Sequence, residues 1–183
     1  MARYVALLRG INVGGKNQIR MADLKACFEE GGFENVATYI ASGNVLFESG
    51  ERSAARLTRR IEDLLAARFN HYKASVVLRS KTQMRTVFEQ APKGFGSQPG
   101  RYLSDVVFLK SPLRAAAVLK ILAIKEGVDQ AHAGPGVLYL SRLRSRAAQS
   151  RLNRIASMPE YKNMTIRSWS TTAKLVELMD RTA

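Results

Sequence analysis

The sequence predicts an α+β protein in which the element order β-α-β-β-α-β occurs twice. Two observations support this prediction. Short apolar runs bounded by glycine or proline alternate with amphipathic helical segments. The order of these segments after residue 100 also matches the order before residue 80, although the two halves are not visibly similar in sequence. Units of this order build an antiparallel four-stranded sheet with two helices on one face.

The first half of the chain shows each element by its pattern. Leu24, Cys27 and Phe28 fall at i, i+3 and i+4 on one helical face, and Ser42-Gly43 is a turn signal between two strands. A second helix carries a longer apolar stripe, Leu57, Ile61, Leu64, Leu65 and Phe69. We expect strands at 3–9, 36–41, 44–48 and 74–79 and helices at 21–31 and 53–69.

A connecting segment separates the two halves. Ser80 and Gln83 have the spacing of a capping box and open a short helix that ends before Pro92. The segment 92–100 holds two prolines and three glycines, which is typical of a linker. The predicted domains are therefore 1–91, the linker 92–100, and 101–183.

The second half repeats the order. Ser111 followed by Pro112 predicts a helix start, with a helix running to about Lys125. Ser170 is the expected cap of the last helix. The other expected elements are strands at 104–110, 128–132, 136–141 and 164–168 and helices at 146–157, where Ala148, Leu152 and Ile155 share a face, and at 171–179.

Charge is the unusual feature of the composition. Lys and Arg total 29 against 15 acidic residues, a net charge of +14 with a pI of about 10.4. This balance favours nucleic acid or another polyanion as partner. The alternative is a generally basic surface, because residues 1–100 carry 15 basic and 9 acidic residues and residues 101–183 carry 14 and 6.

The chain indicates an intracellular location. Cys27 is the one cysteine, so no intramolecular disulfide forms, which suits a reducing compartment. No stretch approaches the roughly 20 apolar residues that span a bilayer. We expect a cytoplasmic protein with no membrane partner.

The glycine-rich loop from Gly10 to Lys16 has the G-x-x-x-x-G-K spacing of a phosphate-binding loop. Asn17 stands where a Ser or Thr would hold Mg²⁺, and the next helix begins too late for its N-terminus to face a phosphate. Nucleotide hydrolysis is therefore disfavoured. The loop still suits an anion, since Arg9 and Lys16 flank it. Glycines that only turn the chain are the alternative.

Other candidate residues are polar or basic clusters. Ser42, Gly43 and Asn44 form a polar hairpin tip or a plain turn. Five arginines within 13 residues suit phosphate contacts or a solvated face: Arg142, Arg144, Arg146, Arg151 and Arg154. The candidate ligand-binding residues are Arg9, Gly10, Asn12, Gly14, Gly15, Lys16, Ser42, Asn44, Thr165 and Arg167.

Catalytic patterns are poor. Cys27 lies on an apolar helix face and reads as a buried structural thiol. The histidines, at 71 and 132, have no second ligand at metal spacing, so we expect no metal or other cofactor. Aromatic residues stand where an RNA-recognition fold carries them, but core packing explains them more simply: Tyr4, Phe47, Phe108 and Tyr139.

Several segments of the chain together resemble one family. They are YVALLRGINVGGKN, TYIASGNVLFES, SDVVFLK, GVLYLS, Ser150-Arg151-Leu152 and TIRSWSTTAKLVEL. Over nearly the whole chain they resemble the bacterial domain-of-unknown-function family 1697. The resemblance implies a small cytoplasmic protein of ferredoxin-like units in tandem with no assigned activity. Thr165 and Arg167 match the family's closing T-x-R-N-x-N-T motif, whereas Ser168 and Ser170 replace its asparagines.

Three classes of function remain open. The first is a binding module for nucleic acid or another polyanion, the second a binder or enzyme for a small phosphorylated ligand at the glycine loop, and the third a protein-interaction module. The fold does not choose among them. We expect the Gly10–Lys16 loop and the 165–169 segment to lie close together, because both combine basic and small polar residues outside the core pattern.

Overall fold

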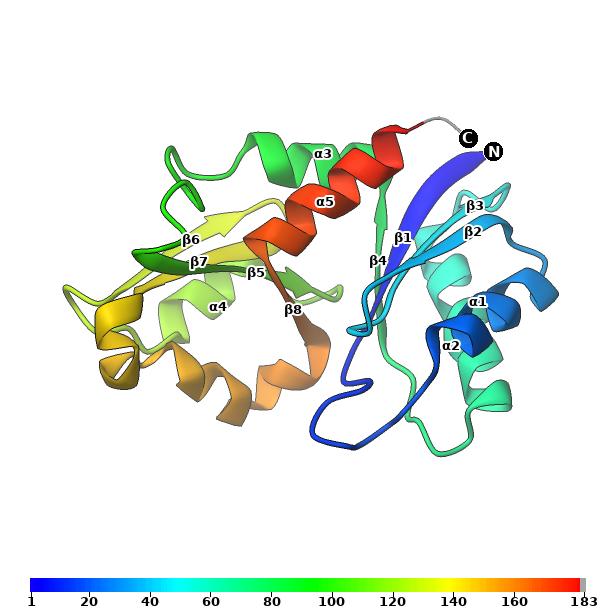
Figure 1. Cartoon of the computed structure of the whole chain (residues 1–183), viewed down its shortest axis with the longest axis horizontal. Helices are drawn as coiled ribbons and strands as arrows, with labels where there is room; N and C mark the ends of the chain where they lie inside the picture. Colours follow the sequence, from blue (N-terminus) through cyan, green and yellow to red (C-terminus); the bar gives the residue numbers. More distant parts are fainter. Residues whose placement is uncertain (182–183) are drawn as a thin grey trace. The chain divides into compact units, whose positions relative to one another are not determined.

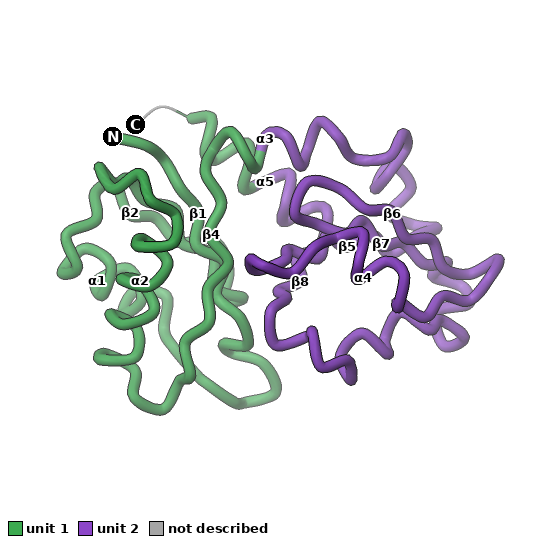
Figure 2. The backbone as a smooth tube through the Cα atoms, turned by 180° about the vertical axis from the view of Figure 1, so that it is seen from behind, with its two compact units in different colours: residues 1–84, 175–183 green, residues 85–174 purple. Residues whose placement is uncertain are grey.

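The computed structural model describes residues 1–181 and divides into two compact units (Figure 2). The first unit is Met1–Met84 with the segment from Leu175 onward, and the second is Arg85–Lys174. The unit boundaries fall inside two helices, α3 (Lys81–Glu89) and α5 (Trp169–Asp180). The segment 92–100, expected as a linker, lies within the second unit.

The first unit follows the expected order (Figure 1). Its elements are β1 (Ala2–Leu8), α1 (Met21–Glu30), β2 (Glu34–Tyr39), β3 (Asn44–Ser49), α2 (Ala54–Arg68) and β4 (Val76–Ser80). The strands form one antiparallel sheet in the order β2-β3-β1-β4. Strand alternation turns Tyr4, Ala6 and Leu8 to the core, where they pack with buried residues of α1 and α2.

The second unit has the same sheet order. Its elements are β5 (Tyr102–Leu109), α4 (Ala115–Ile121), β6 (Asp129–Gly134), β7 (Val137–Leu143), the 3-10 helices η1 (Arg144–Gln149), η2 (Leu152–Ser157) and η3 (Pro159–Asn163), and β8 (Met164–Ser168). The antiparallel sheet runs β6-β7-β5-β8. The prediction of an α+β fold with two ferredoxin-like units in tandem is confirmed.

The predicted α-helix at 146–157 is wrong, because 3-10 helices replace it. Leu152 and Ile155, three residues apart, are both buried and reach the core from η2. A 3-10 helix places i and i+3 on one face. Ala148, expected on the same face, is exposed, and Arg146 has non-helical dihedral angles (φ −124°, ψ 21°). Leu152 and Ile155 therefore close this side of the core together with the partly buried Met158 and Tyr161.

Two predicted caps differ from the structure and one is confirmed. Helix α4 begins at Ala115 and ends at Ile121, so Ser111-Pro112 lies outside it. Helix α5 begins one residue after Ser168, whose Oγ accepts from the N–H of Thr171 at 3.2 Å, so Ser170 is not the cap. The capping box is present: Ser80 Oγ accepts from the N–H of Gln83 (3.2 Å), and Gln83 Oε1 from the N–H of Ser80 (2.9 Å).

The aromatic residues on the central strands belong to the core, as predicted. Tyr4, Phe47, Phe108 and Tyr139 are all buried. Tyr4 stacks on Phe47 with ring centroids 5.8 Å apart. None of these four rings is available as an exposed stacking platform.

No helix within residues 1–181 combines the length and the apolar character needed to cross a bilayer.

Gly43 sets the packing of the hairpin between β2 and β3. Its φ is +88°, and a Cβ there would lie 2.7 Å from Ile11 Cδ1. We expect Gly43→Ala to lower the free energy of unfolding by about 1–3 kcal/mol, through strain and overpacking. Chemical denaturation measures the change.

Gly50→Ala is the matched control for this variant. A Cβ at Gly50 meets nothing within 4 Å, so the change is expected to stay within about 0.5 kcal/mol. Equal stabilities of the two variants would contradict the packing role of Gly43.

Candidate functional site

The loop from Gly10 to Lys16 folds as a tight hairpin rather than a wrapped phosphate cradle. The N–H of Lys16 donates to the carbonyl of Val13 (3.0 Å), and the N–H of Asn12 to the carbonyl of Asn17 (3.1 Å). Gly14 and Gly15 form the turn with φ of +57° and +75°. Two of the backbone donors that would face an anion are therefore used within the loop.

Asn12 fastens this loop to its surroundings. Its Nδ2 donates to the carbonyl of Ile19 (2.9 Å) and to that of Ala41 (2.8 Å), and its Oδ1 accepts from the N–H of Ile19 (2.8 Å). Asn17 likewise donates to the carbonyl of Gly10 at 2.9 Å. These hydrogen bonds give the two asparagines a structural role.

The structure brings the glycine loop and the hairpin tip together. Asn44 is fully buried and donates to the carbonyl of Tyr39 (2.8 Å) and to Ser42 Oγ (3.1 Å). Through Asn12 the loop reaches Ala41 beside this tip. The loop and the hairpin tip thus meet where Asn12 contacts Ala41, and the amides of Asn12 and Asn44 are engaged in hydrogen bonds to the backbone.

A hollow of about 520 Å³ lies beside the glycine loop. Gly15, Arg20, Asp23 and His71 are among the residues that line it. Arg20 Nε donates to Asp23 Oδ2 at 2.8 Å, and the pKa of Arg20 is raised by this partner. Since Asp23 adds a negative charge and engages the arginine, the hollow is a poor site for an anion.

Thr165 and Arg167 lie on β8 in the second unit. Both are buried, and Arg167 Nη1 donates to Thr165 Oγ1 (2.8 Å) and to the carbonyl of Ile166 (2.9 Å). The glycine loop belongs to the first unit. That these two segments share a site stays a prediction.

The five clustered arginines divide into two groups. Arg142 turns inward, donates to Asn153 Oδ1 (2.5 Å) and lies 4.0 Å from Asp105 Oδ2. Arg144 donates twice to the carbonyl of Pro99, at 2.8 and 3.2 Å. The other three, Arg146, Arg151 and Arg154, lie on η1, at the start of η2 and within η2, and they are exposed, as Arg144 is.

The carboxylates of the second unit are mostly withdrawn from its surface. Burial raises the pKa of Asp105, and Arg142 acts against that shift. Asp129 is buried, and its Oδ2 accepts from the backbone N–H groups of Lys125 and Arg151, both at 2.8 Å. Residues 85–174 hold 15 Lys and Arg against 5 Asp and Glu, and within that range only Glu89 and Glu126 are exposed carboxylates.

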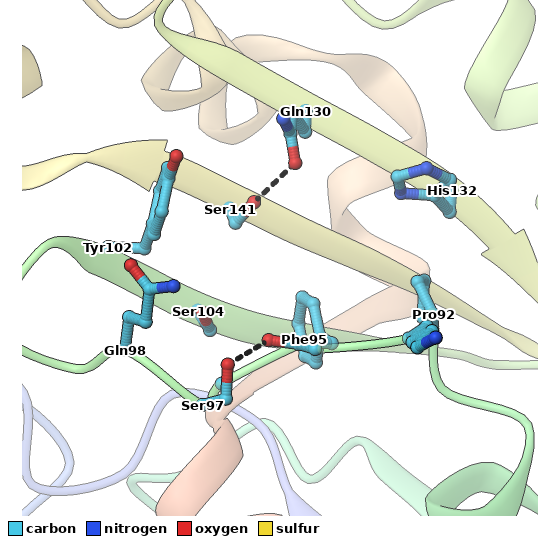
Figure 3. A pocket seen from close by; sticks show the side chains of 12 residues that line it. Pro92, Phe95, Ser97, Gln98, Tyr102, Ser104, Gln130, His132 and Ser141 are labelled. Carbon is cyan, nitrogen blue, oxygen red and sulfur yellow. Dashed lines mark hydrogen bonds between the residues drawn. The ribbon is translucent and has the colours of Figure 1, made fainter.

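The second unit also carries a pocket of about 500 Å³ (Figure 3). It lies on the face of the sheet opposite Leu138 and Leu140, which pack with α4. Its floor is Tyr102 and Ser104 on β5, Ser141 on β7, and Gln130 and His132 on β6. Residues 92–98 form its wall.

The sequence prediction missed this pocket because its wall resembles a linker in composition. The hydroxyl and amide groups of the floor come from three strands, so no local motif marks them. The one available signal is Phe95, an aromatic residue inside a Pro/Gly-rich segment.

The side chains that could act as nucleophile or metal ligand are buried or dispersed within residues 1–181. Cys27 is buried, and burial raises the pKa of its thiol. Within residues 1–181 no three side chains of His, Cys, Asp or Glu are grouped so as to hold a metal ion.

Comparison with known proteins gives a family and a fold. Residues 1–139 match the family model described as "Protein of unknown function (DUF1697)". None of the curated proteins matches the chain. Among solved structures, the conserved bacterial protein SP0830 from Streptococcus pneumoniae is 26% identical with a TM-score of 0.86, and the alignment covers 99% of each chain.

Asn12→Asp tests the structural role of the glycine loop. A carboxylate cannot donate to the carbonyls of Ile19 and Ala41, so we expect a loss of about 1–3 kcal/mol in unfolding free energy. Gln18→Glu makes the same chemical change at an exposed neighbour and is expected to be near neutral. If Asn12→Asp were equally neutral in urea denaturation, the loop would not depend on these bonds.

Tyr139 gives a pH-dependent prediction. Its hydroxyl donates to the carbonyl of Val87 at 2.6 Å, and burial raises its pKa to about 12. At neutral pH, Tyr139→Phe is expected to lose about 1–2 kcal/mol, since the Val87 carbonyl loses its donor.

The difference in unfolding free energy between the wild type and Tyr139→Phe is expected to decrease at high pH. The folded-state pKa lies above the unfolded value near 10, so this contribution is full below about pH 10 and is lost as the pH rises through about 12. Denaturation at a series of pH values measures it, with Tyr39→Phe as control. A difference that grew with pH would contradict the assignment.

Proposed function

Since the chain belongs to the DUF1697 family of proteins of unknown function, we propose from its own surface that it binds nucleic acid or another polyanion through the second unit. The observation that supports the proposal is the charge of residues 85–174, with 15 basic residues and only two exposed carboxylates. Such a surface attracts the phosphate backbone without regard to base sequence.

The two units differ in charge. The first unit holds 14 Lys and Arg against 10 Asp and Glu, whereas the second holds 15 against 5. Several first-unit cations are also paired on the surface, as in Lys25 with Glu29 and Arg68 with Glu30. A polyanion therefore meets a stronger positive potential at the second unit.

The strongest basic stretch begins at β6 and includes the 3-10 helices. Residues 130–174 contain a single carboxylate, Glu160, which is half-buried. Arg146 donates to Gln149, a neutral partner, at 2.9 Å. Arg151 and Arg154 lie exposed nearby in the chain. Three guanidinium groups on the surface of one short segment suit phosphate contacts, because arginine presents several donors in a fixed fork.

The binding of a small phosphorylated ligand at the glycine loop is the second candidate. It is favoured by the exposed turn of Gly14 and Gly15 beside Lys16. The bonds made by the N–H groups of Asn12 and Lys16 leave it with fewer donors than a phosphate-binding loop needs. A polyanion bound at the second unit explains the excess of basic residues there, which a ligand at the glycine loop does not. A cytoplasmic location would bring nucleic acids into reach.

The triple variant Arg146→Gln, Arg151→Gln, Arg154→Gln tests the proposal. Binding of labelled single-stranded RNA and DNA is followed by fluorescence anisotropy at several salt concentrations. We expect weaker binding and a shallower dependence of log K on log salt, by about 0.7 for each lost phosphate contact.

The matched control is Arg52→Gln, Arg59→Gln, Lys73→Gln, which removes three exposed positive charges from the first unit. It is expected to bind nearly as the wild type does. Equal losses in the two triple variants would show that net charge alone matters, and absence of binding by the wild type at physiological salt would reject the proposal. Tighter binding of a sulfated polysaccharide than of either nucleic acid would assign the polyanion differently.

A further inference from the structure

The pocket on the second sheet has a polar floor built from one cross-strand row. Ser104 on β5 pairs with Ser141 on β7, and Ser141 pairs with Gln130 on β6. Directly opposed residues of antiparallel strands point to the same face, so the three side chains line up across the sheet. Ser141 Oγ and Gln130 Oε1 lie 3.5 Å apart (Figure 3). The floor therefore presents hydroxyl and amide groups side by side.

The wall of the pocket is held in place by aromatic contacts. The ring of Phe95 meets Tyr139 edge-on, with centroids 5.4 Å apart, and Trp169 at 5.2 Å. Gly96 has φ +73°, and a Cβ there would lie 2.0 Å from Trp169 Cδ1. Only glycine fits this position without a shift of the indole, so the wall is pre-formed.

Hydrogen bonds between residues close in the chain hold the backbone of the wall in one conformation. The N–H of Phe95 donates to the carbonyl of Pro92 (2.9 Å), and the N–H of Ser97 to that of Gly94 (3.1 Å). Ser97 Oγ donates to the same Gly94 carbonyl at 2.7 Å. A ligand in the pocket would therefore meet an ordered loop and would not have to order it, which reduces the cost of binding.

The lining groups define the chemistry of the ligand. None of the twelve described residues that line the pocket is acidic, and Lys93 is its one Lys or Arg. The other polar groups are the hydroxyls of serine and Tyr102, the amides of glutamine, and the imidazole of His132. A cation lacks a counter-charge here, and a compact multiply charged anion lacks arginines on the floor. A neutral polar group with both donors and acceptors fits.

The size and shape of the pocket further restrict the class of ligand that it can bind. A volume of about 500 Å³ lies within the roughly 300–1,000 Å³ of small-molecule sites. The floor is a sheet, and the half-buried ring of Tyr102 stands at its side (Figure 3). A planar group with a polar edge can lie over such a floor and reach its hydroxyls and amides.

We propose that this pocket binds a nucleobase, carried either by a free nucleotide or by an unpaired residue of a nucleic acid strand. For the strand-borne base the inference rests on the proposed function. The bases of a duplex have their hydrogen-bonding edges engaged, so a strand is bound in single-stranded form. Lys93, an exposed residue of the wall, is the one Lys or Arg of the lining that could contact a phosphate joined to the base.

The test compares a short labelled single-stranded RNA with an abasic strand of the same length and charge. Phosphate contacts alone hold the abasic strand, whereas the base-bearing strand also fills the pocket. We expect the wild-type protein to prefer the base-bearing strand by about tenfold or more, as for one stacked and hydrogen-bonded base.

The floor variant is Ser104→Ala, Gln130→Leu, Ser141→Ala, and it is expected to lose this preference while holding the abasic strand unchanged. Its control makes the same substitutions at exposed positions of the second unit outside η1 and η2, Gln90→Leu, Ser111→Ala and Ser170→Ala. Gln98→Ala, at an exposed position of the wall, is a second variant that should fold normally and reduce the preference. Circular dichroism checks the fold of each.

A second arm adds free nucleoside monophosphates to the isotope-labelled protein and follows amide shifts by NMR. Shifts at Ser104, Gln130 and Ser141 without strand binding would support the pocket with a free nucleotide as its ligand, even if the proposed polyanion function failed. The base pocket would be overturned if the base-bearing and abasic strands bound equally well, if the floor variant bound both as the wild type does, and if no nucleotide shifted the amides. The proposed polyanion function would still stand.

Discussion

The docking of Phe95 against Tyr139 and Trp169 is the contact on which the second unit depends. The ring of Phe95 packs edge-on against Tyr139, which is buried and also donates to the Val87 carbonyl, while Ser104, Gln130 and Ser141 line the pocket beside it. The same contact turns a Pro/Gly-rich segment into an ordered wall. Burial of the aromatic rings is favourable, whereas burial of the polar row Ser104–Ser141–Gln130 without partners is costly. The same segment therefore packs its aromatic residue and leaves the polar row accessible as a pocket floor.

Charge in this protein is arranged by burial as much as by composition. The buried Asp129 accepts hydrogen bonds from backbone N–H groups, and the half-buried Asp105 lies 4.0 Å from Arg142. The exposed arginines of η1 and η2 add to the excess of basic side chains in this unit. The proposed phosphate contacts and the proposed base pocket would complement each other, since phosphate contacts supply affinity and base contacts supply selectivity.

Much of the fold follows from the sequence, and much of the candidate site does not. Strand periodicity and the Ser80–Gln83 capping box indicate the tandem fold, because both are local signals. The helix predicted at 146–157 fails, since Leu152 and Ile155 satisfy 3-10 spacing as well as α spacing. Counting charges in residues 1–100 and 101–183 understates the positive charge of the second unit. The segment from Leu175 onward belongs to the first unit, and composition does not reveal which acidic residues are buried. The pocket depends on strand register, which no single segment reveals.

We propose the second unit as the binding surface of the protein. The most direct test of this proposal is an NMR map of amide shifts in the whole chain as a short single-stranded RNA is added. We expect shifts at η1, η2 and the wall 92–98, with little change in the first unit. Shifts centred instead on the Gly10–Lys16 loop, with the second unit silent, would contradict it.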